Sequence, residues 1–139
     1  MRPQRKAEGM PMKNSLISMG VIDEKRFTRE CITQSLRALD DRLRIKGFPT
    51  CDECLQTVED QDLVVYYLRE YPSQWDKNSQ KLISFRKLLS IVPVIVLSDT
   101  ENRNSLEQIF GSGARGCIPT DNAAPEQIIE IIGLLCLGK

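Results

Sequence analysis

The sequence predicts an α/β fold in which a parallel sheet is covered by helices on both faces. Two segments, Leu63–Leu68 and Val92–Leu97, are continuous apolar runs, the pattern of parallel strands that are buried on both sides. Segments whose apolar residues have helical spacing follow such runs, so that a strand and then a helix recur five times along the chain. Repeated units of this kind form an open parallel sheet, and 139 residues are enough for one compact domain.

The first unit begins at the segment Ser15–Ile22, which is short and apolar and predicts a buried strand. An acidic pair, Asp23 and Glu24, follows it directly. The segment Lys25–Asp41 is then expected to be an amphipathic helix. Its apolar residues at helical spacing are Phe27, Cys31, Ile32, Leu36 and Leu39.

The second unit is weaker. Leu43–Phe48 carries alternating apolar residues and stops at Pro49, which predicts a short strand. Thr50 is suited to cap a short helix over Cys51–Val58, because Glu53 stands at the capping-box position. The third strand is the apolar run Leu63–Leu68 described above.

The second half of the chain supplies the remaining elements. A polar loop over Arg69–Asn78 precedes a helix whose apolar face is formed by Leu82, Phe85, Leu88 and Leu89. After the strand Val92–Leu97, a helix is expected over residues 101–111, and Gly116–Ile118 is a short strand. Pro125 is favoured in the first turn of a helix, so it opens a last helix that runs to about Leu137.

Charge and hydropathy exclude several classes of protein. The 19 basic residues balance the 19 acidic ones and the pI is about 6.3, so the chain has no overall attraction to nucleic acid or to anionic lipid. No apolar stretch is long enough to span a bilayer, and no signal-peptide core follows the basic N-terminus. We therefore expect a cytoplasmic protein with a disordered basic tail over residues 1–14 and a single domain over residues 15–138.

The chain has no histidine and five cysteines. The missing histidine rules out a Ser-His or Cys-His nucleophile within this chain, and the odd number of cysteines favours reduced thiols. Cys51 and Cys54 form a Cys-x-x-Cys pair, but zinc would need two more ligands. The neighbouring Asp52 and Glu53 disfavour the thiolates that redox chemistry requires. Structural cysteines on a helix are therefore favoured over a reactive pair.

Five segments, in this order and spacing, resemble the receiver domains of two-component response regulators. They are Val21–Glu24, Asp62–Leu68, Pro93–Ser98, Gly113–Thr120 and Pro125–Ile129. The resemblance covers nearly the whole chain, and it implies a flavodoxin-like (βα)5 doubly wound fold with a five-stranded parallel sheet of order 2-1-3-4-5. The segment Gly113–Thr120 is similar to receivers of LuxR/NarL-type transcriptional regulators.

The resemblance also identifies a candidate pocket. In receiver domains an acidic pair follows the first strand, a phosphoacceptor aspartate ends the third, and a hydroxyl ends the fourth. Asp23 and Glu24 match the acidic pair and Ser98 matches the hydroxyl, whereas Tyr67 stands at the acceptor position. The chain is therefore similar to a degenerate receiver, or pseudo-receiver.

Further departures from the receiver pattern also indicate a degenerate site. Thr120 stands where the fifth strand should end in a lysine, although alignment back from the last helix would place Asp121 there. The usual aromatic residue of that strand is Cys117, and residues 70–75 replace the usual loop after the acceptor. Three changes at one site indicate that phosphotransfer has been lost.

The candidate pocket is expected to lack a functional metal, a cofactor and catalytic residues. A phenol, with an ordinary pKa of about 10, is neutral at pH 7 and is a poor ligand for a hard cation. Asp23 and Glu24 alone could hold only a weak, water-rich magnesium ion. We hypothesise that the ring of Tyr67 fills the pocket and that its hydroxyl bonds to Asp23 or Glu24, which would hold one conformation permanently.

The last helix is apolar around most of its circumference, which suggests a second buried face. In receivers the face made by the fourth and fifth helices and the fifth strand commonly forms dimers. We therefore expect a homodimer, or a complex with another protein, in which this helix makes the contact. The expected interface residues are Ile128, Ile131, Ile132 and Leu135.

The function that fits these observations is a phosphorylation-independent signalling or transcription-regulatory module, not an enzyme, that acts by protein contacts. Three alternatives remain open: a receiver phosphorylated at another carboxylate such as Asp99 or Asp121, the N-terminal part of a LuxR-type DNA-binding regulator, and a small flavodoxin-like enzyme. Loops without the phosphate cradle that a flavin needs argue against the last. Membrane binding is not expected, and nucleic acid would be bound only through a further output domain.

Overall fold

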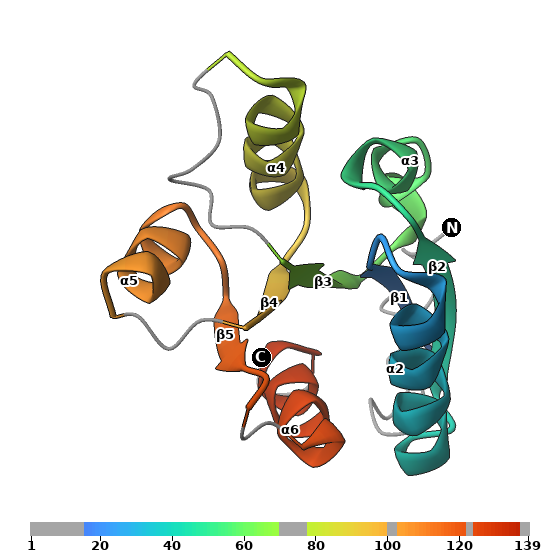
Figure 1. Cartoon of the computed structure of the whole chain (residues 1–139). Helices are drawn as coiled ribbons and strands as arrows, with labels where there is room; N and C mark the ends of the chain where they lie inside the picture. Colours follow the sequence, from blue (N-terminus) through green and yellow to red (C-terminus); the bar gives the residue numbers. More distant parts are fainter. Residues whose placement is uncertain (1–15, 70–77, 100–102, 122–123, 137–139) are drawn as a thin grey trace.

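The structure is a computed structural model that describes residues 16–69, 78–99, 103–121 and 124–136. The tail expected over residues 1–14 lies outside the described residues, as does most of the loop expected over residues 69–78. The described residues form one sheet with helices on both of its faces (Figure 1). Among the described helices, none has the length and apolar character needed to cross a membrane.

The sheet contains five strands, and every pair of neighbouring strands runs in parallel. They are β1 (Ile17–Ile22), β2 (Leu43–Phe48), β3 (Leu63–Leu68), β4 (Val94–Ser98) and β5 (Gly116–Pro119). Their order in the sheet is β2-β1-β3-β4-β5, which confirms the predicted fold class and strand order. The fourth strand begins two residues later than predicted, because the Val92 N–H bonds to the Leu88 carbonyl and so closes the preceding helix.

The helices follow the strands as predicted. They are α2 (Arg26–Leu39), α3 (Cys51–Leu55), α4 (Gln80–Ile91), α5 (Arg103–Gly111) and α6 (Pro125–Cys136). Thr50 caps α3 as expected, since its side chain accepts a hydrogen bond from the Glu53 N–H. The short helix predicted over Cys51–Val58 is divided, because α3 ends at Leu55 and a 3-10 turn follows at Val58–Asp60.

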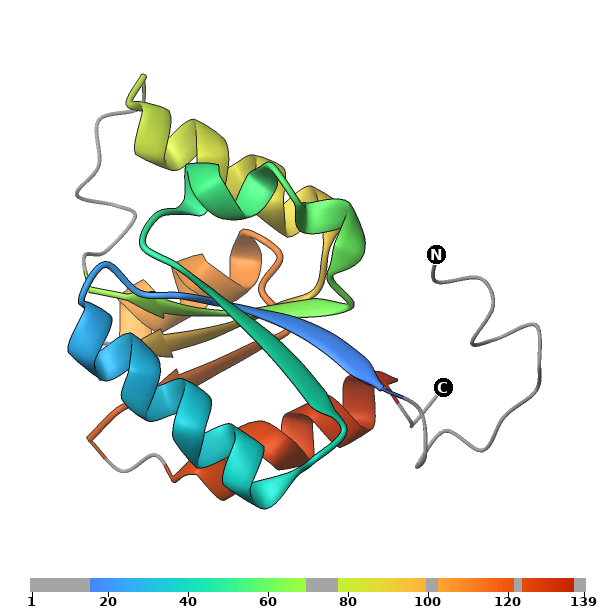
Figure 2. The ribbon, with the colours of Figure 1, turned by 90° about the vertical axis from the view of Figure 1, so that its right-hand side faces the viewer.

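The helices form two layers, one on each face of the sheet (Figure 2). One layer contains α2 and α6, and the other contains α3, α4 and α5. Successive strand residues face opposite layers. Tyr66 therefore packs with the α3 and α4 side, where its ring meets that of Phe85 edge to face at 5.6 Å between centres, whereas Tyr67 packs with the α2 and α6 side.

The last helix corrects part of the predicted interface. Ile128 and Ile132 are 5% and 0% exposed and lie in the core between α6 and the sheet, so they are not surface contacts. Ile131 and Leu135 are partly buried against the same core. Among the side chains of this helix whose burial is described, the exposed large apolar one is Leu134, at 71%. Most of the apolar character of α6 is thus used to hold the helix on its own domain.

Candidate functional site

The residues predicted to form the pocket lie at the carboxyl ends of the strands. Asp23 follows β1, Tyr67 lies near the end of β3, Ser98 ends β4, and Thr120 follows β5. This edge is where open α/β sheets bind their ligands, at the point where the strand order reverses. In this sheet the reversal falls between β1 and β3.

Asp23 is paired with Arg69, a residue that the sequence did not single out. The Arg69 Nε lies 3.1 Å from the Asp23 Oδ1, and its Nη2 lies 3.0 Å from Oδ1 and 3.1 Å from Oδ2. The Asp23 side chain is fully buried and the Arg69 side chain is 17% exposed. A guanidinium group therefore occupies the space beside both oxygens of the Asp23 carboxylate.

Other groups complete the surroundings of Asp23. The Thr28 hydroxyl donates a hydrogen bond to the Asp23 Oδ2 and accepts one from the Arg69 Nη2 at 2.7 Å. The Lys25 N–H donates to the Asp23 Oδ1 at 3.0 Å, and the Arg29 guanidinium donates to the Asp23 carbonyl at 2.6 Å. Both carboxylate oxygens are thus satisfied by the protein, as a buried charge requires.

Tyr67 does not bond to the acidic pair, which corrects the hypothesis made from the sequence. Its hydroxyl donates to the Asp99 Oδ1 at 2.6 Å, and the Thr120 hydroxyl donates to the same oxygen at 2.7 Å. The reason is the direction of the Tyr67 ring, which points toward the α2 and α6 layer. The Arg69 guanidinium carbon lies over this ring, 3.9 Å from its centre.

The pKa values of Asp99 and Tyr67 are both shifted in directions that preserve the hydrogen bond between them. The hydrogen bonds from Tyr67 and Thr120 hold the pKa of Asp99 below its ordinary value, so the carboxylate stays ionised. Burial, with the bond to Asp99 as the next cause, raises the pKa of Tyr67 above its ordinary value, so the phenol stays protonated. The phenol therefore acts as a neutral donor to a carboxylate.

Together these contacts form one network, which we call the Arg69 network: Thr28, Asp23, Arg69, Tyr67, Asp99 and Thr120. It ties together the carboxyl ends of β1, β3, β4 and β5. In this network the Arg69 guanidinium pairs with the Asp23 carboxylate, and the Asp99 carboxylate accepts hydrogen bonds from Tyr67 and Thr120. Each ionised group therefore has an oppositely charged or hydrogen-bonding partner.

The Arg69 network does not fit a divalent cation. A hard cation needs several oxygen ligands that are free to face it, whereas both oxygens of Asp23 accept hydrogen bonds from protein donors. Across the described part of the chain, no group of three or more His, Cys, Asp or Glu side chains is placed to hold a metal ion. The donor set around Asp23 therefore does not support the weak magnesium site considered for Asp23 and Glu24.

The structure brings together only part of the predicted pocket. Asp23, Tyr67 and Thr120 belong to the Arg69 network, whereas Glu24 is exposed and lines a neighbouring cavity. Ser98 is fully buried at the end of β4, where its carbonyl accepts the Thr120 N–H at 2.8 Å.

Two residues of the network could have been inferred from strand geometry. Residues two positions apart on an extended chain share a face, so Arg69 could be expected to lie beside Tyr67. Asp99 directly follows Ser98 at the end of β4, next to the end of β3 in the sheet. The pairing of Arg69 with Asp23 could not be inferred in this way, because it joins the ends of β3 and β1, and local spacing does not show that these strands are neighbours.

The Cys-x-x-Cys pair has the properties of a structural element. Cys51 and Cys54 are buried in the core. Burial raises the pKa of the Cys51 thiol to about 12 and that of Cys54 to about 11. Both residues therefore remain protonated thiols at neutral pH, and a thiol is a poor nucleophile.

Comparison with known proteins shows which fold this is. No family model and no curated protein matches the chain by sequence. By structure the chain is similar to the isolated REC domain of RcsB from Salmonella enterica serovar Typhimurium, whose structure was determined in the presence of phosphomimetic BeF3−. The TM-score is 0.69 and the sequence identity is 17%, over 90% of this chain and 91% of that one. It is similar to a LuxR family DNA-binding response regulator from Silicibacter pomeroyi, at a TM-score of 0.68 and 19% identity over 89% and 94% of the two chains.

The signal receiver domain of the response regulator NarL from Mycobacterium tuberculosis gives a TM-score of 0.67 at 14% identity, over 90% of this chain and 99% of that one. Together with the strand order, these likenesses establish that the chain has the fold of response-regulator receiver domains, including those of LuxR/NarL-type regulators.

Proposed function

We propose that this chain is a receiver-like regulatory module that works without phosphorylation and acts by contacts with other proteins. The observation that carries the proposal is the ion pair between Arg69 and the fully buried Asp23. It places a permanent positive charge where a receiver domain needs an exchangeable cation. The acceptor position next to it holds Tyr67, a neutral phenol bonded to Asp99.

The energetics of the pair favour a permanent state. Removing one partner of a buried ion pair costs about 3–5 kcal/mol, because the other charge is left buried and unpaired. A cation could bind Asp23 only after the three close contacts between Arg69 and its carboxylate are broken. The Arg69 network therefore resists the metal binding that phosphotransfer requires, and the module is proposed to be neither an enzyme nor a phosphoacceptor.

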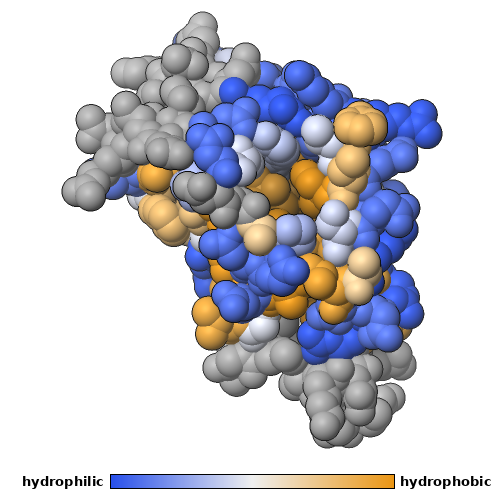
Figure 3. Space-filling model, turned by 60° about the horizontal axis from the view of Figure 1, so that its bottom comes forward, coloured by the Kyte–Doolittle hydropathy of each residue, from blue (hydrophilic) through white to orange (hydrophobic). Residues whose placement is uncertain are grey.

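We further propose that the module forms a homodimer through α6. Figure 3 shows that hydrophobic residues gather in a hollow in the middle of the face that contains α2 and α6, with hydrophilic residues around it. A cavity of about 210 Å³ lies between α2 and the start of α6, and Cys31, Ile32 and Tyr67 are among its lining residues. The exposed Leu134 lies farther along α6. Burial of the Leu134 side chain against a second copy of the chain would remove apolar surface from water, which favours association.

Leu134 allows the dimer to be tested without damage to the core. Sedimentation of the wild-type chain should show a dimer, and Leu134→Asp should shift the population toward the monomer. Ile83→Asp is a matched control, because Ile83 is 51% exposed on α4, in the other layer. A wild-type chain that remains monomeric at high concentration, or an equal effect of the two variants, would reject the dimer.

Phosphorylation independence is tested with the ligand present in the similar RcsB structure. The amide NMR signals of residues 23, 67 and 98 should not move when BeF3− and Mg²⁺ are added together. Saturable movement of these signals would show that the site still accepts a phosphoryl mimic and would refute the proposal.

A further inference from the structure

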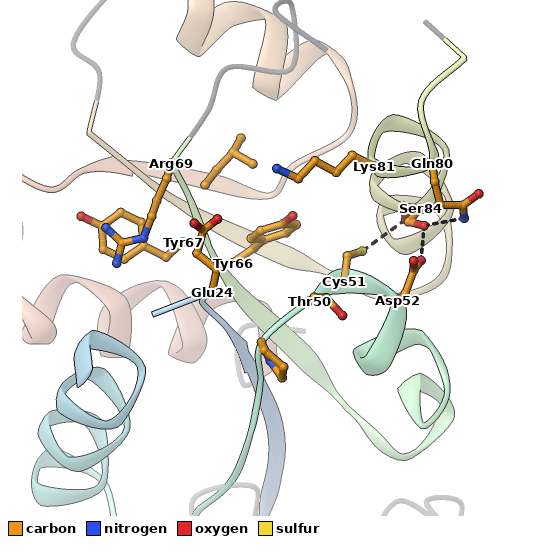
Figure 4. A pocket seen from close by; sticks show the side chains of 12 residues that line it. Glu24, Thr50, Cys51, Asp52, Tyr66, Tyr67, Arg69, Gln80, Lys81 and Ser84 are labelled. Atoms are coloured by element: carbon orange, nitrogen blue, oxygen red, sulfur yellow. Dashed lines mark hydrogen bonds between the residues drawn. The ribbon is translucent and has the colours of Figure 1, made fainter. Parts of the chain in front are cut away.

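The cavity next to Glu24, on the side of α3 and α4, has polar walls whose groups bond to one another (Figure 4). The Ser84 hydroxyl donates to the Asp52 carboxylate and accepts a bond of 3.0 Å from the Gln80 amide. The Cys51 thiol donates to the Ser84 carbonyl at 3.4 Å. These polar groups already have partners within the protein, so the cavity indicates no ligand of a particular charge.

A different, polar groove lies between α2 and the edge strand β2. Its volume is about 330 Å³. Arg29 and Arg37 line it from α2, and Ile45 and Gly47 line it from β2. The groove is separate from the Arg69 network, and the proposed function does not use it.

Neither arginine of this groove forms an ion pair within the described part of the chain. The guanidinium groups of Arg29 and Arg37 each donate a hydrogen bond to a backbone carbonyl, at 2.6 and 3.1 Å. The carboxylate among the lining residues, Glu30, is paired with Arg26 at 2.7 Å. Because a guanidinium group has five N–H donors, both arginines keep donors and positive charge for a ligand.

The edge of β2 adds backbone donors to the groove. Among the described strands β2 pairs with β1 alone, and the carbonyls of Arg42 and Phe48 face β1 because they accept bonds from it. Residues of a paired strand face its neighbour alternately, so the N–H groups of Ile45 and Gly47 face the outer edge. The Ile45 carbonyl on that edge accepts a bond from Arg37. The excess of donors disfavours pairing with a further strand and favours an anion.

Gly47 allows Arg29 to lie directly against the strand. A Cβ atom at this position would come within 3.1 Å of the Arg29 Cδ and 3.3 Å of its Nε. Arg29 is half-buried there, and its guanidinium is anchored on the Asp23 carbonyl. The side chain is therefore ordered before a ligand arrives, which lowers the entropic cost of binding.

The spacing of the two arginines indicates an elongated anion. Arg29 contacts β2 at Gly47 and Arg37 contacts it at Ile45, and two residues of a strand span about 7 Å. A single phosphate group is smaller than this separation, whereas a chain of two or three phosphoryl groups can reach both arginines. Ionised phosphoryl oxygens only accept hydrogen bonds, and guanidinium groups bind them with paired N–H donors.

We propose that the groove between α2 and β2 binds a diphosphate or triphosphate group, inorganic or carried by a nucleotide. Arg29 and Arg37 bind the phosphoryl oxygens, and the Gly47 N–H donates a further hydrogen bond. The inference does not depend on the loss of phosphorylation, because none of these three residues belongs to the Arg69 network. Its failure would leave the proposed function unchanged.

The test is a titration of the whole chain with inorganic triphosphate, diphosphate, phosphate and sulfate, followed by amide NMR. Salt at about 0.15 M screens long-range attraction. Triphosphate should shift the signals of residues 29, 37, 45 and 47 saturably, and it should bind at least tenfold more tightly than phosphate or sulfate. Equal binding of all four anions would overturn the proposal, because it would show only general attraction to positive charge.

Three variants locate the site. Arg29→Gln and Arg37→Gln should each weaken triphosphate binding at least tenfold. Arg86→Gln is the matched control, because it removes the same charge from an exposed position on α4 and should bind as the wild type does. Arg37 is exposed, so Arg37→Gln leaves the core intact. The absence of saturable shifts in the wild type, or an equal effect of all three variants, would overturn the site.

ATP and citrate define the chemistry of the ligand. ATP that binds more tightly than inorganic triphosphate would assign the site to a nucleotide, and ATP that binds equally or more weakly would assign it to the phosphate chain alone. Citrate, an anion with carboxylates only, should bind at least tenfold more weakly than triphosphate. Equal binding of citrate would overturn the preference for phosphate.

Discussion

The pairing of Arg69 with Asp23 predicts a large loss of stability when only one partner is removed. The substitution Arg69→Met keeps a long apolar stem but leaves the Asp23 carboxylate fully buried without its cation. Removal of one partner from a buried pair costs about 3–5 kcal/mol. Since the Thr28 hydroxyl and the Lys25 N–H still bond to the carboxylate in the variant, we expect the lower end, about 3 kcal/mol.

Urea denaturation at pH 7 measures this change directly. In thermal unfolding, the same loss of about 3 kcal/mol in the free energy of unfolding would lower the Tm by about 10 °C for a domain of this size. The double variant Asp23→Asn/Arg69→Met should recover part of the loss, because it removes the unpaired charge. A double-mutant cycle should then give a coupling energy of about 1.5 kcal/mol or more.

Arg26→Met is the matched control for this experiment. Arg26 pairs with Glu30 at 2.7 Å, but their side chains are 81% and 60% exposed. Exposed pairs contribute little to stability, so the Tm of this variant should not change measurably. A cost below about 1 kcal/mol for Arg69→Met, or additivity in the cycle, would show that Arg69 and Asp23 do not form a stabilising buried ion pair.

Two further predictions concern titrating groups. Tyr67→Phe removes one of the two hydroxyl donors to Asp99 and should cost about 1 kcal/mol by urea denaturation at pH 7. Because the folded pKa of Asp99 is lowered from its ordinary value of 3.8, the stability that it contributes is present above that value and is lost as the pH falls through the folded pKa. The advantage of the wild type over Tyr67→Phe should therefore shrink as the pH falls below about 3.8, and an advantage that stays constant as the pH is lowered would contradict this assignment. Iodoacetamide at pH 8 should modify the exposed Cys31 first, while Cys51 and Cys54, with thiol pKa values of about 12 and 11, remain unmodified in the folded chain. Peptide mass analysis that found Cys51 or Cys54 modified as fast as Cys31 would show that the pair is reactive.

The fold could be predicted from the sequence because its signals are local. Continuous apolar runs such as Leu63–Leu68 require a strand covered on both faces, and helical spacing in Arg26–Leu39 requires a helix with one buried side. The order of the strands came from the resemblance to receiver domains, since local spacing does not determine which strands are neighbours.

The candidate site was predicted only in part, because its contacts join distant segments. The position of Tyr67 near the end of β3 could be predicted from the apolar run Leu63–Leu68. Its bond to Asp99 instead of Asp23 depends on which helical layer the ring faces. The ion pair across 46 positions between Asp23 and Arg69 depends on the way β3 passes beside β1. Ile128 and Ile132 were predicted as interface residues but lie in the core. An apolar helix surface does not show which part of it covers the helix's own sheet.

Incubation with acetyl phosphate and Mg²⁺ tests most directly the proposal that the module works without phosphorylation. We expect the intact mass of the wild-type chain to remain unchanged, because Arg69 is paired with the Asp23 carboxylate and Tyr67 is a protonated phenol bonded to Asp99. A mass increase of one phosphoryl group, located on Asp99, Asp121 or another carboxylate of the described strand ends, would contradict the account.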